Sequence, residues 1–322
     1  MLLLVLAVSA AATEKLPPDM AGEISPPTGR IAFIRAGDIW VMEAIGTNQQ
    51  AVCRVSNAEG RLSWSADNKK IVFTRSGMVD LKRPDLVGGR HKVYDLFICL
   101  LDSAQAGNRK YWVRLTHDVG SRGPEWSSDG RKIIFWKDMN ANTISARTPN
   151  YQLCTVEPDG SNLEVLRPGW EGEDEQFLVT PSINQWGDIA FVFFAEMQPG
   201  GLVILPRDEV TLSLDSIKVL AEKGEGCIAP SWSPDGRWLA VVCQSETGSG
   251  LYIVSPDLQQ RYLVAEPPSR TRISNQPPSF SPDSKWLTFA TGDNSIWICD
   301  ITGGGLRRLT SPGKDQAPCW SR

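Results

Sequence analysis

A twelve-residue stretch that recurs along the chain constrains the fold more than any other feature of the sequence. Its clearest copy is Pro230-Ser-Trp-Ser-Pro-Asp-Gly-Arg-Trp-Leu-Ala-Val241. Related copies occupy residues 62–73, 124–135 and 278–289, and a degenerate copy, one residue shorter, occupies residues 181–191. A sixth copy is divided between the two ends of the chain, with its first half at 318–321 and its second half at 28–33. A repeat divided in this way indicates a closed ring in which one unit is built from both ends.

Each copy combines a turn with two short apolar runs. In Ser-Pro-Asp-Gly, proline presets φ, and Asp-Gly supplies a turn with a glycine that tolerates positive φ. The run that follows, as at residues 237–241 and 132–135, is rich in strand-forming residues. Proline at the first position suits the beginning of a strand, where no ladder donor is required. The tryptophan of the copy is bulky enough to fill the space between neighbouring units.

Six units of four short strands predict an all-β fold, a six-bladed β-propeller of four-stranded antiparallel blades. The ring would be closed by joining the N- and C-terminal strands in one blade. The strands expected in blades one to three are 30–34, 38–42, 51–55 and 317–320; 61–64, 70–74, 94–100 and 111–115; and 124–127, 132–136, 151–156 and 163–166. Those expected in blades four to six are 181–184, 188–194, 201–205 and 217–220; 230–233, 238–243, 251–254 and 262–264; and 278–281, 286–290, 295–299 and 306–309.

The repeat, a WD-like Pro-x-Trp-Ser-Pro-Asp-Gly motif followed by Ile-Ala-Phe, Ile-Trp-Val and Leu-Thr patterns, resembles the propeller of TolB. It is similar, too, to the propellers attached to prolyl-oligopeptidase-type peptidases. The resemblance covers about residues 27–322. Its matching residues are turns and inter-blade packing positions, so it implies the fold more strongly than the function. TolB carries an α/β domain before its propeller, whereas a short linker stands at that place here.

The first residues indicate export. Residues 1–12 are apolar and end in small residues, as in a signal peptide, whose apolar core is shorter than a membrane span. A buried or disordered apolar tail is the alternative. Residues 13–28 contain four prolines and predict a linker, so the propeller would occupy 29–322. We therefore expect a periplasmic or secreted monomer with no integral membrane span after the signal is removed.

Seven cysteines stand at 53, 99, 154, 227, 243, 299 and 319, and no Cys-x-x-Cys occurs among them. Five lie in apolar strand-like runs, which favours buried thiols over metal ligands. If the protein is exported, Cys227 and Cys243 are the pair that the spacing indicates for a disulfide.

Composition and motifs exclude several classes of function. A net charge of −4 without any basic run gives no electrostatic footprint for nucleic acid. The sequence has no Gly-x-Ser-x-Gly, His-Glu-x-x-His, P-loop or dinucleotide-binding motif. We therefore expect no catalytic residues, no metal site and no cofactor.

Uneven repeat spacing indicates where a binding site would lie. Asp67 and Asp129 are 62 residues apart, while Asp235 and Asp283 are only 48 apart. The excess in blades two and three falls in the connections from second to third strand, about 75–93 and 137–150. Both lie on the face opposite the Ser-Pro-Asp-Gly turns, and loops on a rigid scaffold commonly carry function. The candidate partner-binding residues are Arg83, Arg90, His91, Arg122, Glu125 and Arg147. Among them, Glu125 should line the central channel, as should Ser231 and Ser279.

These observations favour an exported, non-enzymatic interaction module that binds a protein partner, itself an envelope or secreted protein, through the loop-rich face. Basic loop residues would suit an acidic partner or an anionic ligand. One alternative is a saccharide- or peptide-binding protein or enzyme with its site at the channel mouth. Another is a propeller that once gated a peptidase and now stands alone.

Overall fold

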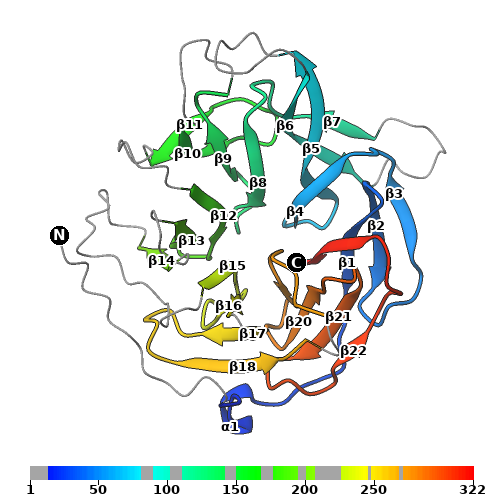
Figure 1. Cartoon of the computed structure of the whole chain (residues 1–322), viewed down its shortest axis with the longest axis vertical. Coiled ribbons are helices and arrows are strands. Elements are labelled where there is room, and N and C mark those ends of the chain that lie inside the picture. The colour runs from blue at the N-terminus through cyan, green and yellow to red at the C-terminus, as the bar shows by residue number, and fades with distance from the viewer. Residues whose placement is uncertain are drawn as a thin grey trace.

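The computed structural model describes residues 14–80, 90–101, 111–141, 150–167, 177–194, 201–206, 226–245, 248–267 and 271–322. Within them, six antiparallel sheets follow one another around a central axis, and the four-residue α1 (Pro18–Ala21) is the one helix (Figure 1). The predicted six-bladed propeller is therefore confirmed.

Blades one to three are built as the repeats predict, except that several strands are longer. Blade one holds β23 (Asp315–Trp320), β1 (Arg30–Arg35), β2 (Asp38–Glu43) and β3 (Gln50–Cys53). Blade two holds β4 (Ala58–Trp64), β5 (Lys70–Asp80), β6 (Arg90–Leu100) and β7 (Trp112–Arg114). Blade three holds β8 (Ser121–Trp126), β9 (Ile133–Asp138), β10 (Tyr151–Val156) and β11 (Glu164–Arg167).

Blades four to six complete the ring. Blade four holds β12 (Phe177–Ile183), β13 (Ile189–Phe194) and β14 (Gly201–Leu205), and the fourth strand expected at 217–220 lies outside the described residues. Blade five holds β15 (Gly226–Trp232), β16 (Leu239–Gln244), β17 (Ser249–Val254) and β18 (Arg261–Ala265). Blade six holds β19 (Ser279–Phe280), β20 (Trp286–Ala290), β21 (Ile296–Asp300) and β22 (Arg307–Arg308).

The two ends of the chain close the ring in blade one. Strand β23, drawn red in Figure 1, pairs with the blue β1, with Trp320 opposite Ile31 and Asp315 opposite Arg35. The Arg35 guanidinium donates to the Asp315 carboxylate at 2.6 and 2.7 Å, which fixes this pairing at its outer end. Division of the sixth repeat between the termini therefore has the structural meaning that the sequence predicted.

The innermost strands of five blades contain a β-bulge. In blade five, Ile228 pairs with Val242 and Ser231 pairs with Ala240, so that Ala229 and Pro230 together oppose one residue. Ala229 has a φ of 58°. Proline fits there because the bulged residue donates nothing to the ladder. In blade two the bulge is wider. Gly60 and Arg61 lie between the pairs Glu59↔Thr74 and Leu62↔Phe73, and because Thr74 and Phe73 are consecutive, neither residue has a partner in β5.

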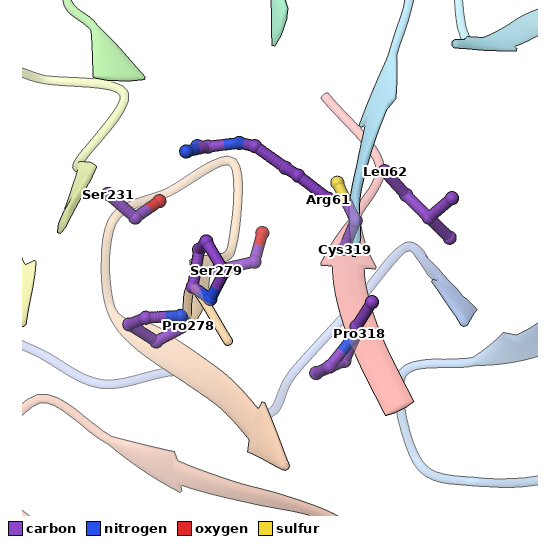
Figure 2. A pocket seen from close by; sticks show the side chains of 9 residues that line it. Arg61, Leu62, Ser231, Pro278, Ser279, Pro318 and Cys319 are labelled. Carbon is purple, nitrogen blue, oxygen red and sulfur yellow. The ribbon is translucent and has the colours of Figure 1, made fainter. Parts of the chain in front are cut away.

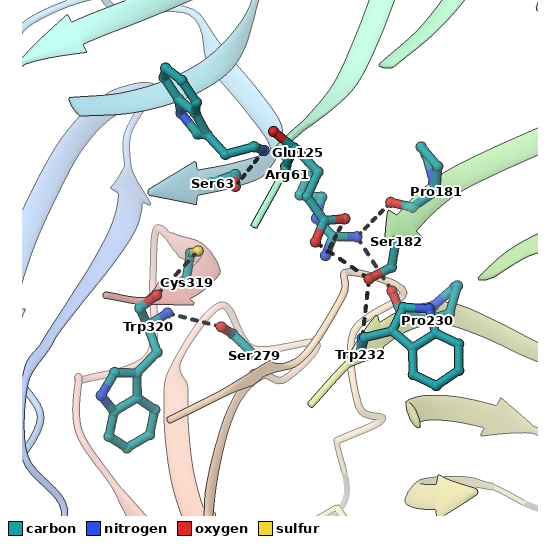
Figure 3. Close-up of polar contacts among 12 residues, drawn as sticks. Arg61, Ser63, Glu125, Pro181, Ser182, Pro230, Trp232, Ser279, Cys319 and Trp320 are labelled. Atoms are coloured by element: carbon teal, nitrogen blue, oxygen red, sulfur yellow. Dashed lines mark hydrogen bonds and ion pairs between the residues drawn. The ribbon is translucent and has the colours of Figure 1, made fainter. Parts of the chain in front are cut away.

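The side chain between the repeat's proline and its aromatic residue accepts a hydrogen bond from the next blade. Trp126 N donates to Ser63 Oγ at 3.0 Å, Trp232 N to Ser182 Oγ at 3.1 Å, and Trp320 N to Ser279 Oγ at 2.9 Å (Figure 3). Glu125 of blade three and Cys319 of blade one occupy the corresponding position. Within the described residues, three of the six blade junctions are thus bonded along the channel wall.

Apolar side chains fill the space between blades behind this wall. Between blades two and three, for example, Val72 and Ile98 pack with Trp126 and Phe135, all four at most 4% exposed. Burial of this kind contributes about 1.5–3 kcal/mol for each large side chain.

The segment that we expected to act as a linker contacts blades five and six. Leu16 is 2% exposed, and Lys15 Nζ donates to Val264 O at 2.6 Å. Farther along, Trp286 Nε1 donates to Ser25 O at 2.8 Å. Residues 1–13, which include the predicted signal peptide, lie outside the described residues.

Cys227 and Cys243, the pair indicated by their spacing, form a disulfide across β15 and β16. The thiols of Cys53, Cys99, Cys154 and Cys299 are free and buried, as the apolar runs around them predicted.

One prediction about the loops is wrong. In the connection expected at 75–93, residues 75–80 and 90–93 are strand, because β5 and β6 continue as a hairpin through the pairs from Ser76↔Tyr94 to Asp80↔Arg90. The segment lacks the apolar alternation that marks a strand, but its backbone groups are satisfied by the partner strand. The extra length of blade two is therefore a paired hairpin as far as residue 80.

Replacing Ser182 with Ala tests the junction bonds. Ser182 is 1% exposed, so its loss leaves the Trp232 amide buried without its acceptor, which costs about 1–3 kcal/mol. Urea unfolding should show that decrease in the free energy of unfolding. Ser161→Ala, at an exposed turn, should change it by less than about 0.5 kcal/mol. Equal stability of both variants would contradict a structural role for the junction bonds.

Candidate functional site

The central channel is lined by one side chain from each blade, at the position between the repeat's proline and its aromatic residue. Glu125, Ser231 and Ser279 lie there, as the sequence predicted, together with Ser63 and Cys319. Ser182 belongs to the same set and bonds across the junction from blade four to blade five. Five of the six side chains are small, so Glu125 is the exception in charge and length.

Arg61 crosses the channel from the wide bulge in blade two. Its Nη1 donates to Pro181 O at 3.0 Å and to Pro230 O at 3.3 Å, so it reaches blades four and five (Figure 3). Its Nη2 lies 3.2 Å from Glu125 Oε2 in blade three. Figure 2 shows the same side chain extended into the space between Ser231 and Cys319, beside a small cavity of about 20 Å³. The arginine therefore fills the middle of the channel and links four blades.

Glu125 is a buried carboxylate with unused acceptor capacity. It is 8% exposed, and Ser182 Oγ lies 3.5 Å from its Oε1. Within the described residues Oε2 accepts no hydrogen bond, although it is paired in charge with Arg61. Burial raises the pKa of the Glu125 carboxyl above its usual value, and the Arg61 and Arg322 guanidinium groups offset only part of that increase.

A cavity of about 240 Å³ opens from Glu125 toward the face of the Ser-Pro-Asp-Gly turns, which we call the turn face. Its inner wall contains Glu125, Arg61 and the channel serines. Its rim contains Ser128, Asn184, Gln185 and Pro234 from the turns of blades three, four and five. The channel thus has a polar, partly enclosed mouth on the face that the loop-length argument did not favour.

The opposite face, which carries the connections from second to third strand, is called the loop face. Here Arg122 at the start of β8 places its guanidinium carbon 3.8 Å from the ring centre of Tyr94 in β6. The ring of Tyr151 in β10 lies 5.9 Å away. Arg122 is exposed, and within the described residues its guanidinium donates to no acceptor. Stacking on Tyr94 therefore orients a guanidinium whose N–H groups bond to none of the described residues.

Buried carboxylates hold the connection beside this arginine. Asp95 accepts from Arg114 Nη2 at 2.6 Å, from Thr116 Oγ1 at 3.2 Å and from Val119 N at 3.2 Å. Asp118 accepts from Ser121 Oγ at 2.7 Å, one residue before Arg122. The loop-face position of Arg122 is consequently set by blade two as well as by its own strand.

Of the six residues predicted for the site, the structure describes the side chains of three, and it does not bring Arg122 and Glu125 together. Arg122 lies on the loop-face rim and Glu125 lies inside the channel, on the two sides of the bulge in β8. His91 is half-buried and pairs with Val79 on the hairpin. It lies in β6, three residues before Tyr94. The Arg90 side chain, Arg83 and Arg147 lie outside the described residues. The prediction thus stays untested as a whole.

Four residues were missed from the sequence: Arg61 in the channel, Tyr94 and Tyr151 beside Arg122, and Trp186, which is exposed in the turn of blade four. The sequence contained a signal for Arg61. It stands immediately before its copy of the repeat, a position that small residues such as Gly123, Ala229 and Ala317 occupy in other blades. Trp186 also departs from the repeat, since it stands where Asp67, Asp129 and Asp235 stand in other turns. Tyr94 and Tyr151 lie outside the repeat and gave no such signal.

The part of the chain that the structure describes shows no group of three or more His, Cys, Asp or Glu side chains arranged to hold a metal ion. Nor does any helix in that part have the length and apolarity needed to cross a membrane.

Comparison with known proteins identifies the ring. Residues 139–322 match the family model described as the TolB β-propeller domain, which is more than half of the chain. An uncharacterized protein of Agrobacterium fabrum is 30% identical over 190 residues, 56% of this chain and 53% of its own, so the chain spans about half the length of that curated relative.

Solved structures share the fold. TolB from Acinetobacter baumannii aligns with a TM-score of 0.66 and 18% identity, covering 91% of this chain and 66% of TolB. A puromycin-hydrolyzing peptidase of Mycobacterium tuberculosis aligns with a TM-score of 0.55 and 13% identity, covering 89% and 44%. At these identities the likeness concerns the fold alone, which hosts both non-enzymatic proteins and enzymes.

Replacing Glu125 with Gln tests the buried carboxylate through pH. Because folding raises its pKa, ionisation of Glu125 opposes folding. Its contribution to stability is fully present below the unfolded pKa, roughly 4.3, and is lost as the pH rises through the folded pKa. The wild type should therefore lose stability relative to E125Q over that interval.

Denaturant unfolding at pH values from about 4 to 8 measures the difference. The exposed Glu23→Gln controls for the loss of one negative charge. A constant difference between the wild type and E125Q at all pH values would contradict a raised Glu125 pKa.

Proposed function

We propose that this chain, which belongs to the TolB β-propeller domain family, is a non-enzymatic interaction module that binds an acidic segment of a protein partner on its loop face. The observation that carries the proposal is the Arg122 guanidinium, which is stacked on Tyr94 and has its donors unused within the described residues.

The geometry of Arg122 suits a carboxylate. A guanidinium presents parallel N–H donors along one edge, which match the two oxygens of an Asp or Glu side chain. Tyr94 covers one face of the group, so less side-chain freedom remains to be lost on binding. Charge-assisted hydrogen bonds of this kind contribute about 1.5–3 kcal/mol each.

A second cation, Lys92, lies near Arg122 on the same face and is paired with Glu59. Lys92 on the hairpin is exposed and lies 5.3 Å from the Tyr94 ring centre. The hydrogen bond from Lys92 Nζ to Glu59, 2.7 Å long, raises the pKa of Lys92, so this amine stays charged. Within the described residues, no carboxylate pairs with Arg122.

A rigid support is the second requirement for such a surface. The hairpin of β5 and β6, the Asp95 network and the Asp118 bond to Ser121 all join at the rim that carries Arg122. A partner would bind a preformed surface, and its affinity would not be reduced by the cost of ordering that rim.

Export is part of the proposal. The apolar residues 1–12 support a signal peptide, and the Cys227–Cys243 disulfide suits an oxidising compartment such as the periplasm or the cell exterior. The partner would then be another envelope or secreted protein.

The experiment compares Arg122→Met with Arg131→Met. Arg131 is an exposed arginine in the turn-face turn of the same blade, so its replacement removes the same charge from the other face. Immobilised wild type should capture a partner from cell-envelope extract, and calorimetry with that purified partner should give dissociation constants. Arg122→Met should weaken binding by about tenfold to a hundredfold.

Arg131→Met should bind as the wild type does, and added salt should weaken the wild-type complex more than the Arg122→Met complex. A partner that binds Arg122→Met and the wild type equally would contradict the proposed surface. So would a loss of binding that is the same for both arginine variants.

A further inference from the structure

We infer that the turn-face mouth of the channel is a binding site for a neutral saccharide, which would stack on Trp186 and place hydroxyl groups in the cavity that ends at Glu125. This inference does not rest on the proposed function, because it concerns the opposite face and other residues.

The turn of blade four differs from the other turns in a way that the fold does not need. In blades two and three, the Ser hydroxyl of the turn donates to the Asp two positions later, as in Ser65 Oγ to Asp67 at 2.6 Å and Ser127 Oγ to Asp129 at 2.6 Å. In blade four the Asn184 side chain holds the turn instead of a serine and an aspartate, because its Oδ1 accepts from Trp186 N at 3.0 Å and from Asp188 N at 2.9 Å.

The position occupied by aspartate elsewhere is thereby freed for Trp186. The Trp186 side chain is 52% exposed, more than most apolar residues of the described chain. Its ring lies on Gly236 of blade five, where an added Cβ would come within 2.0 Å of Cζ3. The glycine backbone therefore supports the ring from below while much of the indole surface faces solvent.

Trp186 adjoins the rim of the cavity but does not itself line it: its ring lies on Gly236, two residues after the rim residue Pro234. The two residues before Trp186, Asn184 and Gln185, form part of the cavity rim. An exposed indole at the edge of a polar pocket offers an apolar surface beside hydrogen-bonding groups, a combination that suits the C–H face and the hydroxyl edge of a sugar ring.

The polar groups of the cavity are suited to hydroxyl ligands. Ser128, Gln185 and Ser231 line it, and within the described residues their side chains make no hydrogen bond. Glu125 Oε2, at the inner end, accepts none either. Together these groups provide acceptors and donors, which sugar hydroxyls match because each hydroxyl both donates and accepts.

Both cations of the cavity already donate to backbone carbonyls, which leaves fewer of their N–H groups for an anionic ligand. Arg61 Nη1 is bonded to Pro181 O and Pro230 O, and Arg322 donates to Trp126 O at 2.6 Å and to Ser127 O at 3.2 Å. Their guanidinium groups are thus engaged with backbone carbonyls, and Arg61 is paired in charge with Glu125. A volume of about 240 Å³ accommodates a ligand of roughly one sugar ring, with further rings extending over Trp186.

The test is calorimetric titration of the whole protein with three neutral trisaccharides: maltotriose, cellotriose and N,N′,N″-triacetylchitotriose. We expect at least one to bind, and Trp186→Ala to weaken that binding by about tenfold or more. Trp186→Tyr should retain most of the affinity, because a phenol ring also stacks. Leu306→Ala, at an apolar residue 39% exposed in blade six, is the matched control and should bind as the wild type does.

Gln185→Ala provides a second variant that the fold tolerates, since its exposed side chain makes no hydrogen bond in the described chain. It should lower affinity without lowering the melting temperature. Thermal unfolding of each variant separates a binding role from a structural one.

Three outcomes would overturn the inference. None of the trisaccharides binds; or one binds with the same affinity to the wild type and to Trp186→Ala; or Trp186→Ala loses affinity only because it is unfolded and Gln185→Ala binds normally. Capture of peptides, but of no saccharide, in a Trp186-dependent manner would likewise assign the mouth to a protein ligand and refute the saccharide site.

Discussion

The structure depends on one recurring interaction: the backbone N–H of an innermost strand donates to the side chain that the preceding blade extends into the channel wall. Ser63, Ser182 and Ser279 accept these bonds at 2.9–3.1 Å. The residue before each acceptor is the repeat's proline or, in blade two, Leu62, and the donor belongs to the aromatic residue of the next repeat. A short motif therefore supplies an acceptor, a donor and an inter-blade side chain together, which explains why its recurrence implies a ring.

The sequence predicted the blades well because the repeat is a local pattern, and the structure confirms its turns, strands and terminal closure. It did not predict the hairpin beyond Arg75, where Ser76, Gly77 and Asp80 interrupt the apolar alternation. Those residues form a strand because the partner strand satisfies their backbone N–H and C=O groups. Backbone pairing does not depend on the side chains, so it leaves no periodic pattern in the sequence.

The candidate sites were less predictable, since they occur where the repeat is broken. Glu125 was recognisable, because it occupies a position held elsewhere by serine or cysteine. The roles of Arg61 and Trp186 could not be recognised without the structure. A wider bulge places Arg61 in the channel, and the Asn184 side chain takes over the backbone hydrogen bond that an aspartate at the position of Trp186 would accept. Arg122 was selected for its charge, but its orientation by Tyr94 depends on a contact between two blades.

In this account a closed ring, blocked at its centre by Arg61, keeps two faces rigid and independent, and the loop face carries the protein-binding surface. Hydrogen–deuterium exchange of the protein with and without its captured partner tests that claim most directly. The account predicts slowed exchange in the peptides around Tyr94, Val119–Gly120 and Tyr151, with exchange at the turn-face residues Asn184–Asp188 unchanged. Slowed exchange confined to the turn face, with the peptides around Arg122 unaffected, would contradict it.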